Sequence, residues 1–243
     1  MKIAGTTAAT VTDLWAGVEA KIEHASTLEQ AAQELANAIY DQFGESVVLA
    51  RVYVTVPLGA LPRANQTFVR NLAESANASS QLQETTPVLS LIGSFGEEGE
   101  WRDRRNSKGH VGIPLLSASF VDAIPMISRL LRELGLPVDW ADHHDIEIVK
   151  KMGTGLFFVE NAAEAVDHEG RKIIAVQDFV SAHQVRSVFG AGGAYPNGQM
   201  VVGVVFCRDL FDRSVSERFL PLINLFEEKT EALLGSGRVF SNA

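Results

Sequence analysis

The sequence predicts a mixed α/β protein, and two kinds of pattern indicate it. Residues 47–57, VVLARVYVTVP, are rich in β-branched residues and end at a proline, as strands often do. Residues 199–207, QMVVGVVFC, are almost continuously apolar, which fits a central strand buried on both faces. Apolar residues also recur at helical spacing over 11–22 and 215–234. We therefore expect a covered sheet together with amphipathic helices.

The bulk composition narrows the class of protein. The chain has 243 residues, of which 46% are hydrophobic and 21% charged, as in ordinary globular proteins. Its net charge of −9 argues against binding nucleic acid or an anionic membrane through a basic field. One cysteine excludes an intrachain disulfide and a cysteine-rich zinc site. No apolar run approaches about 18 residues and the opening lacks a signal-peptide core, so we expect a cytoplasmic protein.

The first half of the chain predicts three helices and two strands. A helix over 11–24 is followed by a second helix over 28–44, capped by Ser26 or Thr27 and stopped by Gly44. The remaining predictions are the strand 47–57, a helix over 62–82, a strand over 87–95 and a charged loop over 96–110.

The second half predicts more strands. A helix over 117–135 is followed by an ambiguous stretch, 139–151. We then expect strands over 153–162 and 171–176, a short helix over 177–183, strands over 184–190 and 199–207, and a helix over 214–234.

A glycine cluster, Gly190, Gly192 and Gly193, precedes Pro196-Asn197-Gly198. A phosphate-binding loop leads into the N-terminus of a helix, whose free N–H groups bind the anion. Here the glycines lead into a strand. We therefore favour a hairpin connection over phosphate binding.

Two segments carry a resemblance to a known family. Residues 26–54 (STLEQAAQELANAIYDQFGESVVLARVYV) and 176–209 (VQDFVSAHQVRSVFGAGGAYPNGQMVVGVVFCRD) resemble the opening and closing parts of GAF domains in bacterial signalling proteins. The resemblance implies an α+β fold with a six-stranded antiparallel sheet, terminal helices on one face and a roofed small-molecule pocket on the other. We place an N-terminal helix over 1–25, the GAF-like domain over 26–235 and a tail over 236–243.

The resemblance implies a non-catalytic sensory domain that binds an unidentified small molecule. GAF domains that bind bilins generally hold them through a cysteine beside a histidine, whereas Cys207 is followed by Arg208. The methionine sulfoxide reductase branch uses several cysteines, and the Asn-Lys…Phe…Asp-Glu signature of cyclic-nucleotide binders is not found in this sequence. The cofactor therefore stays unknown.

Alternation along the strand 47–57 indicates the ligand-binding residues. One face carries Val48, Ala50, Val52, Val54 and Val56, and the other carries Leu49, Arg51, Tyr53 and Thr55. If the sheet is covered on this face as well, the cation, phenol and hydroxyl of Arg51, Tyr53 and Thr55 would line a ligand cavity. The alternative is an edge strand with Arg51 in solvent.

The charged loop 96–110 adds further candidates. Its cations either hold a carboxylate or phosphate over the pocket, beside Trp101, or form a solvated loop paired with its own acids. The predicted ligand-binding residues are Arg51, Tyr53, Thr55, Phe95, Trp101, Arg104, His110, Phe158 and Arg186. We assign no catalytic or metal-binding residue.

Three other functions are compatible with parts of the sequence. Cys207 with His183 suggests the nucleophile and base of a small hydrolase or redox enzyme, although a lone cysteine at a strand end is more often a core residue. His143 and His144 resemble metal ligands, but adjacent side chains point in different directions, which favours a polar loop or helix cap. A third hypothesis is a scaffold that has lost its ligand and fills its own pocket.

The two apolar stripes at helical spacing, over 11–22 and 215–234, predict a homodimer. Trp15 lies on the first stripe, and Phe219, Leu222 and Phe226 lie on the second. Burying them across a two-fold axis would form a four-helix bundle. The competing interpretation is that the N-terminal helix folds back over its own sheet within a monomer.

Overall fold

The chain folds around a six-stranded antiparallel sheet with the strand order β3-β2-β1-β6-β5-β4. The computed structural model describes residues 1–241. The strands are β1 (Val47–Pro57), β2 (Pro87–Gly96), β3 (Gly112–Pro114), β4 (Gly155–Val159), β5 (Ser187–Ala194) and β6 (Met200–Cys207). This sheet confirms the fold class that the sequence predicts. The short strand β3 had no counterpart among the predicted elements.

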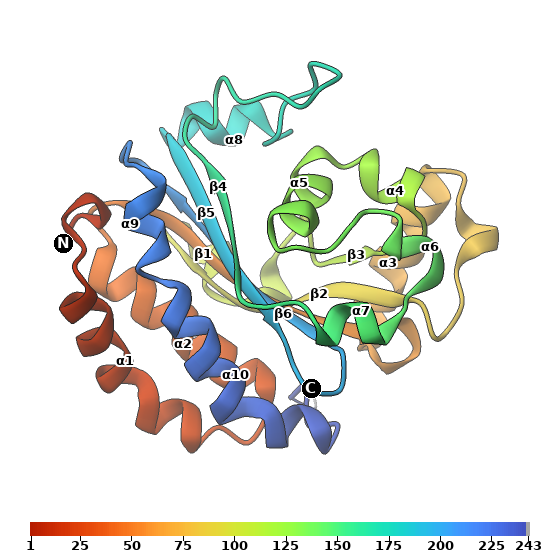
Figure 1. The fold of residues 1–243 in the computed structure, drawn as a ribbon, viewed down its shortest axis with the longest axis horizontal. Coiled ribbons are helices and arrows are strands. Elements are labelled where there is room, and N and C mark those ends of the chain that lie inside the picture. The colour runs from red at the N-terminus through yellow and green to blue at the C-terminus, as the bar shows by residue number, and fades with distance from the viewer. Residues whose placement is uncertain (242–243) are drawn as a thin grey trace.

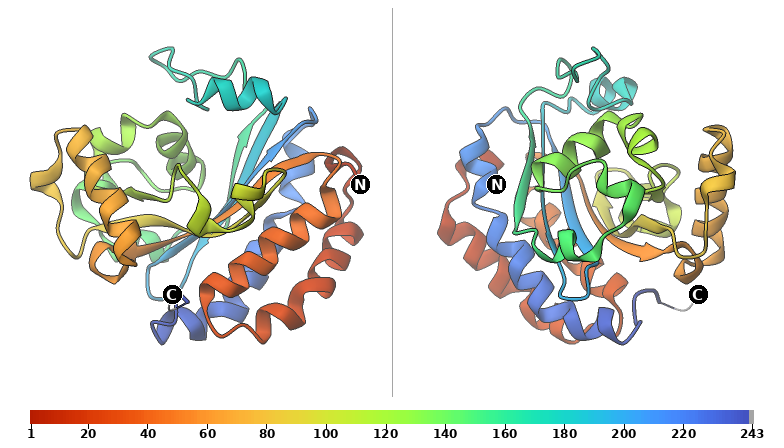
Figure 2. Two further views of the ribbon diagram at one scale, coloured as in Figure 1. Left: turned by 180° about the vertical axis from the view of Figure 1, so that it is seen from behind. Right: turned by 45° about the vertical axis from the view of Figure 1, so that its right-hand side comes forward.

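Helices cover both faces of the sheet (Figure 1). They are α1 (Ala8–Glu23), α2 (Leu28–Phe43), α3 (Arg63–Ser75), α4 (Ala118–Asp122), α5 (Pro125–Glu133), α6 (Trp140–His143), α7 (Ile146–Lys150), α8 (Gln177–Ala182), α9 (Arg213–Glu217) and α10 (Leu220–Gly235). The helices α1, α2 and α10 lie on one side, and α3 to α7 lie on the other (Figure 2). The GAF-like arrangement of terminal and middle helices is therefore present.

The terminal helices form two layers on their side of the sheet. The helices α2 and α10 pack on the strands, and α1 packs on α2 and α10 (Figures 1 and 2). Trp15, Phe219 and Phe226 are buried in this core within the single chain. The apolar stripes are thus covered without a second copy, as the competing monomer interpretation expects. Their burial no longer argues for a dimer.

A bulge near the start of β1 changes which side chains share a face of the strand. The pairing of β1 with β6 shifts between Val47 and Leu49, so Val48 is an extra residue on its strand. Val48 consequently joins the core on the far side from α2, while Val47 joins the core beneath the terminal helices. The prediction that Val48 shares a face with Ala50 was wrong, because an alternation argument assumes an unbroken ladder.

Two predicted helices are interrupted near prolines. The helix predicted over 117–135 is divided into α4 and α5, and Pro125 begins α5. The helix predicted over 214–234 is divided into α9 and α10, with Pro221 in the first turn of α10. Proline has no N–H to donate to the preceding turn and is accepted at the start of a helix. The helix predicted over 62–82 ends at Ser75, followed by a separate short turn at Ser79–Gln81.

Residues 171–176 do not form the predicted strand. Lys172 makes only an isolated bridge with Val166, and the following residues lie in a loop.

The glycine cluster lies within β5 rather than in a turn. A Cβ at Gly190 would come within 2.7 Å of the Gly203 carbonyl oxygen on β6. The turn itself is formed by residues 195–199, where the Tyr195 N–H donates to the Gln199 carbonyl and Gly198 has a φ of 83°. The predicted turn over 196–198 is confirmed, but Gly190 serves close packing between strands, and a Cβ at Gly193 would meet the Glu227 side chain of α10.

Gly93 on β2 sets how closely α2 approaches the sheet. A Cβ at this position would lie 2.4 Å from the Ala32 carbonyl oxygen and 2.5 Å from its carbon, both backbone atoms of α2. Gly93→Ala is expected to lower the free energy of unfolding by about 1–3 kcal/mol, because α2 must move away from β2. Urea denaturation measures the change.

Gly17→Ala is the matched control. Gly17 lies inside α1, exposed to solvent, and a Cβ there would meet no atom within 4 Å. This variant is expected to gain about 0.5–1 kcal/mol through the higher helix propensity of alanine. A Gly93→Ala protein as stable as wild type would contradict the close approach of α2.

Candidate functional site

A cavity of about 210 Å³ lies between the sheet and the segments opposite the terminal helices. Strands β1, β2 and β6 supply its floor through Leu49, Leu89 and Val204. The helix α5 and residues 173–176 form its roof, and Phe179 of α8 lies at its side. The cavity is larger than the roughly 150 Å³ apolar cavities that bind a benzene-sized molecule.

Arg51 lines this cavity and is only 8% exposed. One terminal nitrogen of its guanidinium lies 3.2 Å from the Gly109 carbonyl oxygen and 3.4 Å from the Tyr53 hydroxyl. The other donates to the Ser107 hydroxyl at 3.0 Å, and Nε is buried without a hydrogen-bond partner. Within residues 1–241, Arg51 forms no ion pair with a carboxylate. A buried cation therefore faces an otherwise mainly apolar space.

His110 and Trp101 bring the charged loop to the same cavity. His110 adopts the left-handed backbone region with a φ of 55°. Although the residue as a whole is exposed, desolvation of its imidazole at the cavity, and then the nearby Arg51 cation, lower the pKa of His110 below its usual value. The ring is therefore neutral near pH 7. Trp101 packs edge-on against Phe179, with ring centroids 5.5 Å apart.

Four of the predicted ligand-binding residues thus meet at one cavity: Arg51, Tyr53, Trp101 and His110. Whether they contact a ligand stays a prediction. The structure does not bring the other five to this cavity.

Three of those five serve the fold instead. The Thr55 hydroxyl accepts a hydrogen bond from the Met200 N–H at 2.7 Å and so joins β1 to β6. Phe95 packs with Tyr40, and Phe158 packs with Phe211, on the side of the terminal helices.

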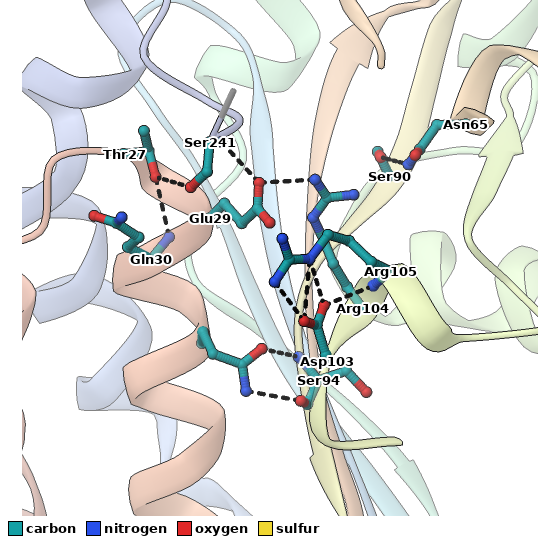
Figure 3. A network of polar contacts seen from close by, with 11 residues as sticks. Thr27, Glu29, Gln30, Asn65, Ser90, Ser94, Asp103, Arg104, Arg105 and Ser241 are labelled. Carbon is teal, nitrogen blue, oxygen red and sulfur yellow. Dashed lines mark hydrogen bonds and ion pairs between the residues drawn. The ribbon is translucent and has the colours of Figure 1, made fainter. Parts of the chain in front are cut away.

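The last two are arginines. Arg186 is exposed to solvent. Arg104 lies in a separate network beside α2, which Figure 3 shows. Its guanidinium donates to the Glu29 carboxylate at 2.7 Å, and the two side chains are 5% and 10% exposed. The Ser241 N–H donates to the same carboxylate oxygen at 2.8 Å. The Arg104 guanidinium also lies over the Phe240 ring, 5.0 Å from its centroid.

Sequence reasoning missed most of the cavity roof. Pro125, Met126 and Ile127 of α5 line it, together with Ile173 and Ile174. The apolar run in RKIIAV was visible in the sequence but was assigned to a strand. The proline inside the predicted helix 117–135 could have indicated where the roof bends.

Cys207 does not form a catalytic pair with His183. The cysteine is fully buried, and burial, together with the charge of Asp209, raises the pKa of its thiol well above the usual value. It belongs to the core beneath the terminal helices. His183 lies on the other side, with its ring 4.7 Å from that of Trp101. The proposed nucleophile is therefore an unreactive core thiol.

Within residues 1–241, the surroundings of the two adjacent histidines do not resemble a cluster of metal ligands. The His144 Nε2 contacts the Leu115 carbonyl oxygen at 2.6 Å. Throughout the described residues 1–241, no three His, Cys, Asp or Glu side chains gather to hold a metal ion. Over the same range, no helix combines the length and apolar character needed to cross a membrane.

Removing one partner of the Glu29–Arg104 pair is expected to destabilise the fold strongly. Glu29→Gln leaves the Arg104 cation buried without a counter-ion, which costs about 3–5 kcal/mol. The free energy of unfolding in urea measures this loss.

The exposed pair Arg70–Glu84, with side chains 48% and 65% exposed, is the matched control. Glu84→Gln is expected to change stability by less than about 1 kcal/mol. Equal effects of the two glutamine variants would show that Glu29 is not the counter-ion that Arg104 needs.

Comparison with known proteins gives similarities of fold. No protein-family model matches the chain, and no curated protein sequence matches it. The GAF domain of an Acinetobacter phosphoenolpyruvate-protein phosphotransferase is similar at 15% identity, over 94% of this chain and 98% of that chain, with a TM-score of 0.49. A phycoerythrobilin-bound GAF domain from a cyanobacterial phytochrome is similar at 10% identity, over 93% and 97%, with a TM-score of 0.48.

A third solved structure is an enzyme. The free methionine-R-sulfoxide reductase from Neisseria meningitidis, in complex with its substrate, is similar at 13% identity, over 96% of this chain and 95% of that chain, with a TM-score of 0.49. The phytochrome domain holds phycoerythrobilin and the reductase holds its substrate, and the similarity is too low to transfer a ligand to this chain. The GAF-like description of this chain rests on its own sheet and helix layers.

Proposed function

We propose that the chain is a sensory domain that binds a small, mainly apolar molecule in the cavity between β1, β2, β6 and α5. The single observation that carries this proposal is the hollow itself, about 210 Å³ in volume and lined largely by apolar side chains. Ligand sites are typically concave and apolar, with a few polar groups that fix orientation. Arg51, Tyr53 and His110 supply such groups here.

The open space favours a ligand-binding domain over a scaffold that has lost its ligand. Such a scaffold is expected to fill the pocket with its own side chains, because packed interiors leave few voids larger than a water molecule. Here the side chains of the roof and the floor leave about 210 Å³ of open space between them. Val176 lines the cavity and is 51% exposed, so it places apolar surface at an entrance.

The proposal includes a signalling role without catalysis. Signalling in a bacterial cytoplasm is a prediction from the sequence resemblance. The fully buried thiol of Cys207 supports a non-catalytic role over the enzyme that was the alternative. Binding of the molecule would then act through conformation rather than through chemistry on the ligand.

Blocking the entrance is expected to prevent binding. Ala175 lines the rim and is exposed, so Ala175→Trp adds bulk there without disturbing the core. Binding of ethylbenzene, followed by NMR shifts of the methyl groups of Leu49, Ile113 and Leu130, is expected to weaken at least about tenfold.

Ala182→Trp is the matched control, because Ala182 is exposed on α8 but does not line the cavity. Its ethylbenzene affinity is expected to equal that of the wild type. No methyl shifts in the wild-type protein at saturating ethylbenzene would contradict the proposed function.

Self-association is a separate prediction. Because Trp15 and Phe219 are buried within one chain, a dimer through α1 and α10 must use their outer polar surfaces. Analytical ultracentrifugation at micromolar concentration tests it. A sedimenting mass of one chain rejects the dimer, and twice that mass supports it.

A further inference from the structure

We propose that the ligand of the cavity carries one carboxylate, which pairs with the Arg51 guanidinium while its apolar body fills the space beneath α5. This inference rests on the proposed function and adds the chemical class of the molecule. It places the acid at the floor of the cavity, on the central part of β1.

The hydrogen-bond partners of Arg51 leave its charge uncompensated. A guanidinium has five N–H donors. The acceptors around Arg51 are the Tyr53 hydroxyl, the Ser107 hydroxyl and the Gly109 carbonyl, all of them neutral. Nε has no partner. These contacts hold the guanidinium in place without neutralising it.

The other deeply buried arginine shows the contrast. Arg104 is buried to a similar degree as Arg51 and is paired with the Glu29 carboxylate at 2.7 Å. Burying a cation is costly unless an anion or strong hydrogen bonds compensate for its lost hydration. Residues 1–241 thus supply an anion to Arg104 and supply none to Arg51, which instead faces a cavity. An anion that arrives with the ligand completes the second pair.

The histidine at the cavity is compatible with this pairing. His110 lies beside Arg51, and desolvation and the Arg51 cation lower the pKa of its ring. A neutral imidazole leaves Arg51 as the one charged side chain among the residues that line the cavity. A single positive charge in an apolar environment matches a monoanion. Planar carboxylates fit the guanidinium fork.

The size of the cavity limits the body of the acid. About 210 Å³ accommodates a phenyl ring with a short chain. We therefore choose 3-phenylpropanoate as the probe and 3-phenylpropanamide as its neutral counterpart, because the two share the same apolar body. Isothermal titration calorimetry of the full chain near pH 7 measures both dissociation constants.

The acid is expected to bind at least about tenfold more tightly than the amide, as a charge-assisted hydrogen bond requires. Arg51→Met removes the cation and keeps an unbranched apolar side chain. In this variant the amide is expected to retain its affinity, while the preference for the acid falls to within about threefold.

Arg186→Met is the matched control, because it removes an equal charge from an exposed position that does not line the cavity. It is expected to keep the preference of the wild type. If Arg51→Met fails to fold, the ratio of the two dissociation constants in the wild-type and Arg186→Met proteins decides the question alone.

Equal affinity for acid and amide in the wild type, or tighter binding of the amide, overturns the carboxylate while leaving the ethylbenzene result and the proposed function intact. The same conclusion follows if ethylbenzene binds and neither phenylpropanoid does. If ethylbenzene also fails to bind, the cavity itself is not a ligand site and both proposals fall.

Discussion

The ion pair between Glu29 and Arg104 holds the irregular loop 96–110 against the helix α2, which packs on the sheet. Arg104 belongs to the charged loop 96–110, which has no apolar periodicity of its own and forms only short turns at Gly99–Arg102 and Arg104–Asn106. The loop is further fixed where the Ser94 hydroxyl donates to the Trp101 carbonyl at 2.8 Å. The same loop brings Trp101, Gly109 and His110 to the cavity.

The position of β1 determines the environment of Arg51. The strand lies between β2 and β6, and Arg51 is opposite Ser94 on one side and Val204 on the other. The sequence left open whether Arg51 lies on an edge strand in solvent, and the strand order excludes that alternative. A cation at the centre of a sheet covered on both faces can reach only what lies above its own face, which here is the cavity.

The sequence predicted the strands and helices well where the pattern is local. The capped start of α2 is one example, since the Thr27 hydroxyl accepts from the Gln30 N–H. The site was less predictable. Phe95 and Phe158 were placed at the cavity although they lie on the opposite side of the sheet, because a single strand does not reveal which face its partners cover. The roof comes from α5 and residues 173–176, and their meeting over β1 depends on tertiary packing.

The segment from Arg104 to Gly109 touches two distant parts of the molecule. At one end it binds Glu29, which also holds Ser241 near the end of the chain, and at the other end it contacts Arg51 through Ser107 and Gly109. Thermodynamic coupling between two sites is reciprocal. If ligand binding in the cavity shifts this segment, it changes how readily residues 238–241 leave α2. Anything that draws those residues away must then change the affinity of the cavity for its ligand by the same factor. A partner that binds residues 238–241 would thereby change the affinity of the cavity for its ligand, and the ligand would change the affinity for that partner equally.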